Sequence, residues 1–243
     1  MNQPADNKKL LDFLLYSYFG CEREVLEQKG NEKCAYRAYL DLNRRIECHY
    51  SSNTLDNMQS RNAPEEDKNI AIKYKDAKKA LIERVCGIIL CSVGKYECVD
   101  GQFGLWHKAK CEEIMSAMNT AVFQDDTLIL KSNSFTYGLA QKWVNMTLKY
   151  LWLLDRLPGG LTEKSLHVPI DSFILEKLQE ENVDGIKRDG DTYKYKGESW
   201  SQLDDYDAYL DIQTKIGQIA GKTFPIEWEI SAWMDIAKKR SNE

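Results

Sequence analysis

Apolar positions along most of the chain recur every three or four residues, which is the spacing of an α-helix that buries one face. Few helix breakers interrupt this period, since the chain has only 5 Pro and 14 Gly. The sequence therefore predicts an all-α fold. The predicted helices are Leu10 to Phe19, Glu32 to Tyr50, Lys68 to Val93, Leu105 to Thr120, Tyr137 to Leu154, Asp171 to Glu181, Leu203 to Ile219 and Ile226 to Arg240.

Two segments lack the helical period. Residues 51–67 are polar and contain Asn, Ser, Gln and one Pro, which indicates a loop. Residues 183–200 alternate Lys, Tyr and Gly around Asp189-Gly190, which is typical of a β-hairpin. We therefore expect one small hairpin within the helical fold.

The chain length of 243 residues suits one domain built from two helical subdomains. We expect a single domain over residues 1–243. Its expected parts are a mostly helical first part, 1–133, a central part, 134–182, and a final part with the hairpin and last helices, 183–243.

The segment Tyr137 to Leu154 is apolar on nearly all sides, which predicts a helix buried in the protein. One narrow polar stripe remains at helical spacing. It consists of Gly138, Lys142, Asn145 and Lys149. A lysine on a buried helix is costly unless it is paired or carries out chemistry. The stripe therefore either meets water or a carboxylate, or it carries a nucleophilic amine.

A carboxylate follows this helix at a position where it can be held rigidly. Pro169 favours an extended backbone before it. Asp171 then stands at the N-cap of a predicted helix that begins with Ser172. Plain capping is the commoner reason for such an aspartate. A cap carboxylate fixed by backbone N–H groups also suits a catalytic role beside a lysine.

These two elements resemble the helix-hairpin-helix DNA glycosylases. In that superfamily a G-x-G-x-K turn opens a buried helix with the catalytic lysine, and a later segment supplies an aspartate at a helix start. The matching segments here are Gly138-Leu139-Ala140-Gln141-Lys142 and Pro169-Ile170-Asp171-Ser172. The order and spacing are closest to the archaeal 8-oxoguanine glycosylase branch. Ala140 replaces the second glycine of the hairpin.

The resemblance implies a DNA N-glycosylase with AP-lyase activity that excises a damaged base such as 8-oxoguanine. Lys142 would form a Schiff base with the sugar, and Asp171 would stabilise the sugar cation. The expected partner is double-stranded DNA with a flipped-out base, without a metal or cofactor. The expected DNA contacts are Gly138, Gln141, Asn145 and Lys149, and the candidate walls of a base pocket are Trp143, Trp228 and Trp233.

Two other functions remain open at this stage. Arg44 and His49 have the R-x4-H spacing of a family of helical ribonucleases. A non-catalytic helical module that binds DNA or protein would also fit. The net charge of −5 requires any DNA surface to be local, and we expect a positive cleft mouth formed by Lys149 and the basic helix Lys73 to Arg84.

The remaining composition points to a cytoplasmic protein. No apolar stretch approaches the length that a membrane span needs, and the first residues are polar. Seven Cys, an odd number, suit a reducing compartment. Four of them follow no common metal motif and are predicted to be buried thiols, namely Cys86, Cys91, Cys98 and Cys111.

Overall fold

The computed structural model describes residues 5–46, 52–93, 102–121, 123–125, 128–130, 135–157 and 160–242, and these are mainly helical. The helices are α1 (Ala5–Phe19), α2 (Arg23–Leu42), α3 (Ser52–Met58), α4 (Glu65–Val93), α5 (Phe103–Thr120), α6 (Tyr137–Leu153), α7 (Ser172–Glu180), α8 (Tyr206–Ala220) and α9 (Pro225–Asn242). A short 3-10 turn, η1 (Asn43–Arg45), follows α2. The predicted all-α fold is confirmed, whereas the division into two subdomains stays a prediction.

The predicted hairpin is confirmed and has a third strand. β3 (Ile186–Asp189) pairs antiparallel with β4 (Thr192–Tyr195), and β4 pairs with β5 (Glu198–Ser199). Gly190 forms the turn with a φ of +59°, a conformation that glycine adopts without strain. A separate two-stranded ribbon joins β1 (Phe123–Asp125) to β2 (Leu128–Leu130).

Two predicted boundaries are wrong. The second helix begins at Arg23 rather than Glu32, and it ends at Leu42, where η1 takes over. The early part buries only Leu26 and Gly30, and a kink at Lys29, where the backbone is not helical, separates it from the rest of the helix. The predicted loop 51–67 also contains α3 and the start of α4. Three acidic residues in the first turn of α4 favour that helix start, because they face the positive end of the helix dipole.

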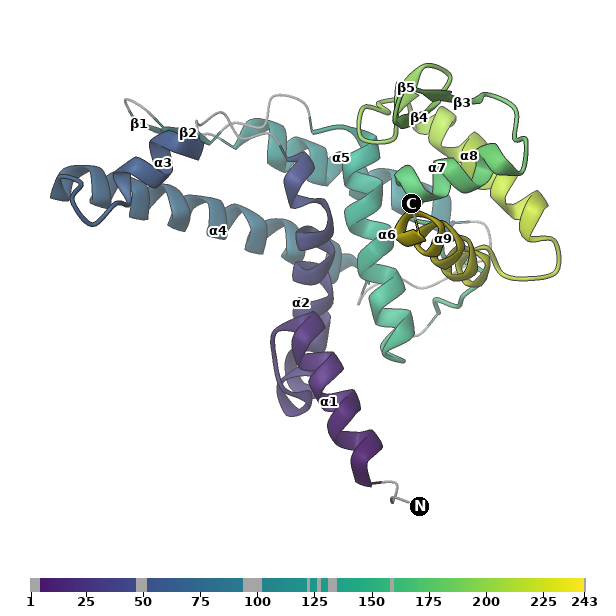
Figure 1. Cartoon of the computed structure of the whole chain (residues 1–243), viewed down its shortest axis with the longest axis horizontal. Coiled ribbons are helices and arrows are strands. Elements are labelled where there is room, and N and C mark those ends of the chain that lie inside the picture. Colours follow the sequence, from purple (N-terminus) through teal and green to yellow (C-terminus); the bar gives the residue numbers. More distant parts are fainter. Residues whose placement is uncertain are drawn as a thin grey trace.

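The buried helix α6 lies near the middle of the molecule, packed against α2, α5 and α8 (Figure 1). Ala35 and Ala38 on α2 are fully buried and let the two helix axes approach closely. Trp143 on α6 fills this contact, and its indole N–H donates to the carbonyl of Ala35 at 2.9 Å. α6 therefore forms a fixed base for side chains on its remaining faces.

The elements after α6 form a second group around it. α7 packs against α9 and against the β3–β4 hairpin, and α8 packs against α6 and α9. The long helix α4 extends away from this group, and α1 projects from α2 on its own (Figure 1). Within the described residues, no helix is both long and apolar enough to span a membrane.

Four of the five cysteines that the structure describes are buried, namely Cys21, Cys34, Cys86 and Cys111. Cys86 and Cys111 are buried, as predicted, whereas Cys91 is exposed and the prediction is wrong there. Cys98 lies outside the described residues. Among the described residues, no group of His, Cys, Asp and Glu is arranged to hold a metal ion.

Candidate functional site

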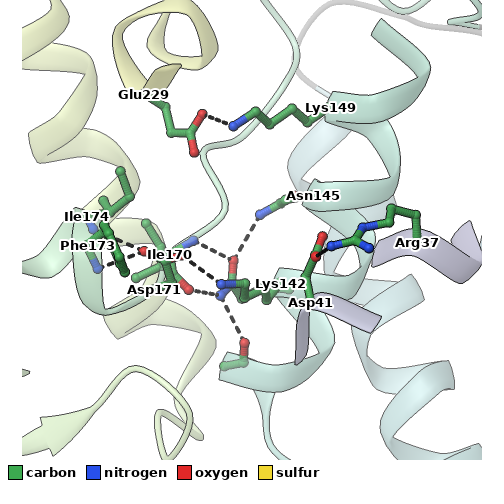
Figure 2. A network of polar contacts seen from close by, with 12 residues as sticks. Arg37, Asp41, Lys142, Asn145, Lys149, Ile170, Asp171, Phe173, Ile174 and Glu229 are labelled. Atoms are coloured by element: carbon green, nitrogen blue, oxygen red, sulfur yellow. Dashed lines mark hydrogen bonds and ion pairs between the residues drawn. The ribbon is translucent and has the colours of Figure 1, made fainter. Parts of the chain in front are cut away.

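The structure brings Lys142 and Asp171 together. The ammonium of Lys142 on α6 donates to Oδ2 of Asp171 at 2.7 Å (Figure 2). The other carboxylate oxygen caps α7, accepting from the backbone N–H groups of Phe173 at 2.9 Å and Ile174 at 3.1 Å. The side chains of the pair are only 9% and 13% exposed. The prediction that both residues face one site is confirmed, and so is the capping position of Asp171.

Two glutamine side chains fix the extended segment that carries Asp171. Gln141 donates to the carbonyl of Ile170 at 2.8 Å and accepts from its N–H at 3.1 Å. Gln213 on α8 does the same for Val168, at 2.7 Å and 3.0 Å. These amides replace the neighbouring strand that an extended buried backbone otherwise needs. Because Gln141 precedes Lys142 and Ile170 precedes Asp171, this clamp holds the ion pair in register.

Three of the four predicted DNA contacts are interior residues, and that prediction is wrong for them. The side chain of Gln141 donates a hydrogen bond to the carbonyl of Ile170. Asn145 is 1% exposed and donates to the hydroxyl of Tyr209 at 2.9 Å. The N–H of Gly138 donates to the carbonyl of Leu203 at 2.8 Å. The start of α6 is therefore closed by protein rather than open to a phosphate.

Gly138 packs so tightly that its lack of a side chain is required. A Cβ at this position would lie 1.8 Å from the carbonyl oxygen of Trp200, which is backbone and cannot rotate away. We expect Gly138→Ala to lower the free energy of unfolding by about 3 kcal/mol. Gly217→Ala on α8 is the control, since nothing lies within 4 Å of its new methyl group. Chemical denaturation should show the control unchanged or slightly stabilised, and equal effects would contradict the close contact.

Lys149, the fourth predicted DNA contact, is also committed to an internal partner. Its ammonium forms an ion pair with Glu229 on α9 (Figure 2). Glu229 is 2% exposed, and burial raises the pKa of its carboxyl group while Lys149 opposes that rise. The ammonium of Lys149 neutralises a buried carboxylate, and its contact with DNA stays a prediction.

The Lys142–Asp171 pair lines two cavities, and a third cavity adjoins them. The aromatic cavity, of about 600 Å³, lies on the α9 side of the pair. The sheet groove, of about 680 Å³, lies against β4 and β5. The junction cavity, of about 360 Å³, lies between the aromatic cavity and the sheet groove. The rings that line the aromatic cavity are Tyr18, Phe19, Tyr150, Phe173 and Trp233.

Of the three tryptophans predicted for a base pocket, one reaches the site. Trp233 lines the aromatic cavity and stacks on Phe173 with ring centroids 5.0 Å apart. Trp143 is fully buried and bonded to α2, so its prediction is wrong. Trp228 packs against the core instead of lining any of the three cavities. Sequence reasoning missed Trp200, whose ring centroid lies 4.9 Å from the Lys142 ammonium, a cation–π contact.

Of the two predicted sources of positive charge, Lys149 lines the aromatic cavity. The basic stretch Lys73 to Arg84 lies on α4 and lines none of the three cavities. Arg44, one half of the predicted ribonuclease motif, lines all three. The other half, His49, lies outside the described residues.

A buried histidine–tyrosine cluster supports the site from behind. The hydroxyl of Tyr209, which bonds Asn145, lies 2.8 Å from Nδ1 of His167. The ring of His107 stacks on Tyr209 at 5.2 Å. Burial lowers the pKa of His167 to about 4 and lowers that of His107 well below its ordinary value of 6.5. Both histidines are therefore neutral in the folded protein at neutral pH.

This cluster predicts a loss of stability in weak acid. The unfolded chain takes up protons near pH 6.5, whereas folded His167 takes one up only near pH 4. The contribution of neutral His167 to the free energy of unfolding is therefore complete above pH 6.5, and it is lost as the pH falls from 6.5 to 4. Urea unfolding at pH 5 should give a free energy about 2 kcal/mol lower than at pH 7.5 from His167 alone. His167→Gln should reduce this difference, and equal stability at both pH values would contradict it.

Comparisons with protein-family models, with curated proteins and with solved structures gave no match to this chain. The geometry of the Lys142–Asp171 pair and its cavities therefore carries the functional argument.

Proposed function

We propose that this protein is a DNA glycosylase with AP-lyase activity that uses Lys142 as its nucleophile. The observation that carries the proposal is the Lys142–Asp171 ion pair, which lines the aromatic cavity and the junction cavity beside the sheet groove. A flipped-out base needs an aromatic pocket, the sugar needs a nucleophile beside that pocket, and the strand needs a groove. The pair offers these three features within one site.

The chemistry follows from the atoms in contact. An amine attacks only after it loses a proton, and the acceptor that touches Nζ of Lys142 is Oδ2 of Asp171. The amine then bonds to C1′ of the sugar while the bond from C1′ to the base breaks, and the base leaves with the proton that Asp171 passes on, which returns Asp171 to its carboxylate form. Opening of the sugar ring gives a Schiff base on Lys142. Loss of the proton at C2′ then releases the 3′ phosphate by β-elimination.

Asp171 is positioned for the charge that this reaction creates. Positive charge develops on the sugar as the base departs, and a fixed carboxylate stabilises it without reorganising. Two backbone N–H groups and the Gln141 clamp hold Asp171 in one orientation. On the far side of the pair, the rings of Phe173 and Trp233 offer a surface on which an extruded base could stack.

Borohydride trapping tests this proposal directly. The purified protein is mixed with duplexes that contain 8-oxoguanine, an alkylated purine, uracil or an abasic site, and the Schiff base is reduced. We expect a covalent protein–DNA adduct on the abasic duplex and on at least one damaged duplex. Peptide mapping should place the adduct on Lys142. Adducts on none of these duplexes would overturn the proposal.

A non-catalytic module that binds DNA or protein is the second candidate. The observation that favours it is the closed state of the pair, since Lys142 and Asp171 neutralise each other and are little exposed. The start of α6 also favours a non-catalytic module, because the N–H of Gly138 bonds to Leu203 and is not open to a phosphate. The two functions differ in one result, because a binding module would retain DNA or a protein partner without forming any covalent adduct.

A further inference from the structure

Two adjacent arginines stand at the mouth of the candidate site. Arg44 and Arg45 belong to η1 and are exposed. Arg44 lines all three cavities, and Arg45 lines the junction cavity and the sheet groove. Neither guanidinium forms an ion pair with another residue in the part of the chain that the structure describes.

The carboxylates of the aromatic and junction cavities already have cationic partners. Asp41 accepts from Arg37 at 2.6 Å and also bonds the hydroxyl of Tyr150. Asp171 is paired with Lys142, and Glu229 with Lys149, as Figure 2 shows.

The charged residues of the sheet groove do not change the charge balance at the junction cavity. Lys194 on its wall pairs with Asp189 at 2.6 Å. Asp204 is an exposed acid on that groove, but it does not line the junction cavity. Among the residues that the structure describes, positive charge without an ion-pair partner therefore concentrates at Arg44 and Arg45, which line the junction cavity with Lys142, although the chain has a net charge of −5.

We propose that Arg44 and Arg45 bind the DNA phosphates on either side of the nucleotide whose sugar reaches Lys142. This inference rests on the proposed glycosylase function. The forked N–H groups of arginine match phosphate oxygens in two directions, and their charge persists at any physiological pH. The start of α6 does not offer its backbone N–H groups to a phosphate, because those of Gly138 and Leu139 already bond to protein. Arg44 and Arg45 on η1 would make the phosphate contact instead.

The helix that precedes η1 supports a phosphate-binding role for the two arginines. η1 follows directly on α2, which packs along α6. Asp41, one turn before the arginines, is tied to α6 through Tyr150. The arginines therefore start from a backbone that is fixed relative to Lys142, which lowers the entropy cost of ordering them on a phosphate.

The test compares two double variants of equal charge change. Arg44→Gln/Arg45→Gln removes the two positive charges of η1. Lys73→Gln/Lys75→Gln removes two exposed positive charges from α4, away from the site. The probe is a duplex with a tetrahydrofuran abasic analogue, which cannot react. Fluorescence anisotropy measures its binding between about 50 and 200 mM KCl, the range over which phosphate contacts lose affinity.

We expect the arginine variant to bind the probe at least about 10-fold more weakly at the lowest salt. The slope of log affinity against log salt should fall by about 1.8, which corresponds to two lost phosphate contacts. The α4 variant should match the unmodified protein in both respects. Equal binding by the arginine variant and the unmodified protein would overturn the inference.

Borohydride trapping on a natural abasic duplex, at saturating protein, separates this inference from the proposed function. A normal adduct with binding that does not depend on the arginines overturns the phosphate contact alone. Arginine-dependent binding without any adduct supports the phosphate contact and overturns the glycosylase function. An adduct that the arginine variant forms only at higher protein concentration supports both.

Discussion

Lys142→Gln is expected to abolish covalent trapping and to reduce strand cleavage by about 1,000-fold or more, because it removes the attacking amine. The glutamine amide can still donate to Oδ2 of Asp171, which the lysine ammonium now contacts at 2.7 Å. Base release and strand cleavage are measured on gels with a damaged duplex, before and after alkaline treatment. An unchanged rate of cleavage by this variant would eliminate Lys142 as the nucleophile.

The same substitution must be separated from a loss of folding. It leaves the mostly buried carboxylate of Asp171 without its counter-charge, at a cost of about 1–3 kcal/mol. Lys164→Gln is the matched control, because Lys164 is exposed and makes no ion pair among the described residues. Both variants should keep the helical circular dichroism of the unmodified protein and bind the abasic analogue. Only Lys142→Gln should lose chemistry.

Asp171→Asn is expected to slow base excision by about 100- to 1,000-fold, because the carboxylate that faces the sugar cation becomes neutral. The asparagine oxygen can still accept from the N–H groups of Phe173 and Ile174, so the cap of α7 should survive. The new amide N–H would face the ammonium of Lys142, and both groups are donors. We therefore expect a moderate loss of stability and retained DNA binding.

Comparison of two substrates assigns the role of Asp171. A preformed abasic site is already an aldehyde, so Schiff-base formation there does not require departure of a base. Asp171→Asn should therefore lose much more activity on a damaged base than on an abasic duplex. Equal losses on both would indicate that Asp171 acts mainly by positioning Lys142 or by accepting its proton.

The helical fold and the local features of the site follow from short-range patterns in the sequence. The three-to-four spacing of apolar residues produced α6 within a residue of its predicted end, and Asp189-Gly190 produced the hairpin turn. The cap at Asp171 follows from a short polar side chain before a run of helix-forming residues. A lysine within an almost wholly apolar helix indicated a paired group, and Asp171 is that partner.

Which polar residues face the site depends on how distant segments pack together in the folded chain. Asn145 and Lys149 lie on the predicted polar stripe, yet Asn145 bonds the buried hydroxyl of Tyr209, and Lys149 meets Glu229 on α9, 80 residues away. Gln213 has no local signal in the sequence, and Arg44 has only its R-x4-H spacing to His49, because their places at the site depend on segments that approach only in the folded chain. Helical periodicity fixes which side of a helix is polar, but the element packed against that side fixes whether it meets water, a carboxylate or a groove.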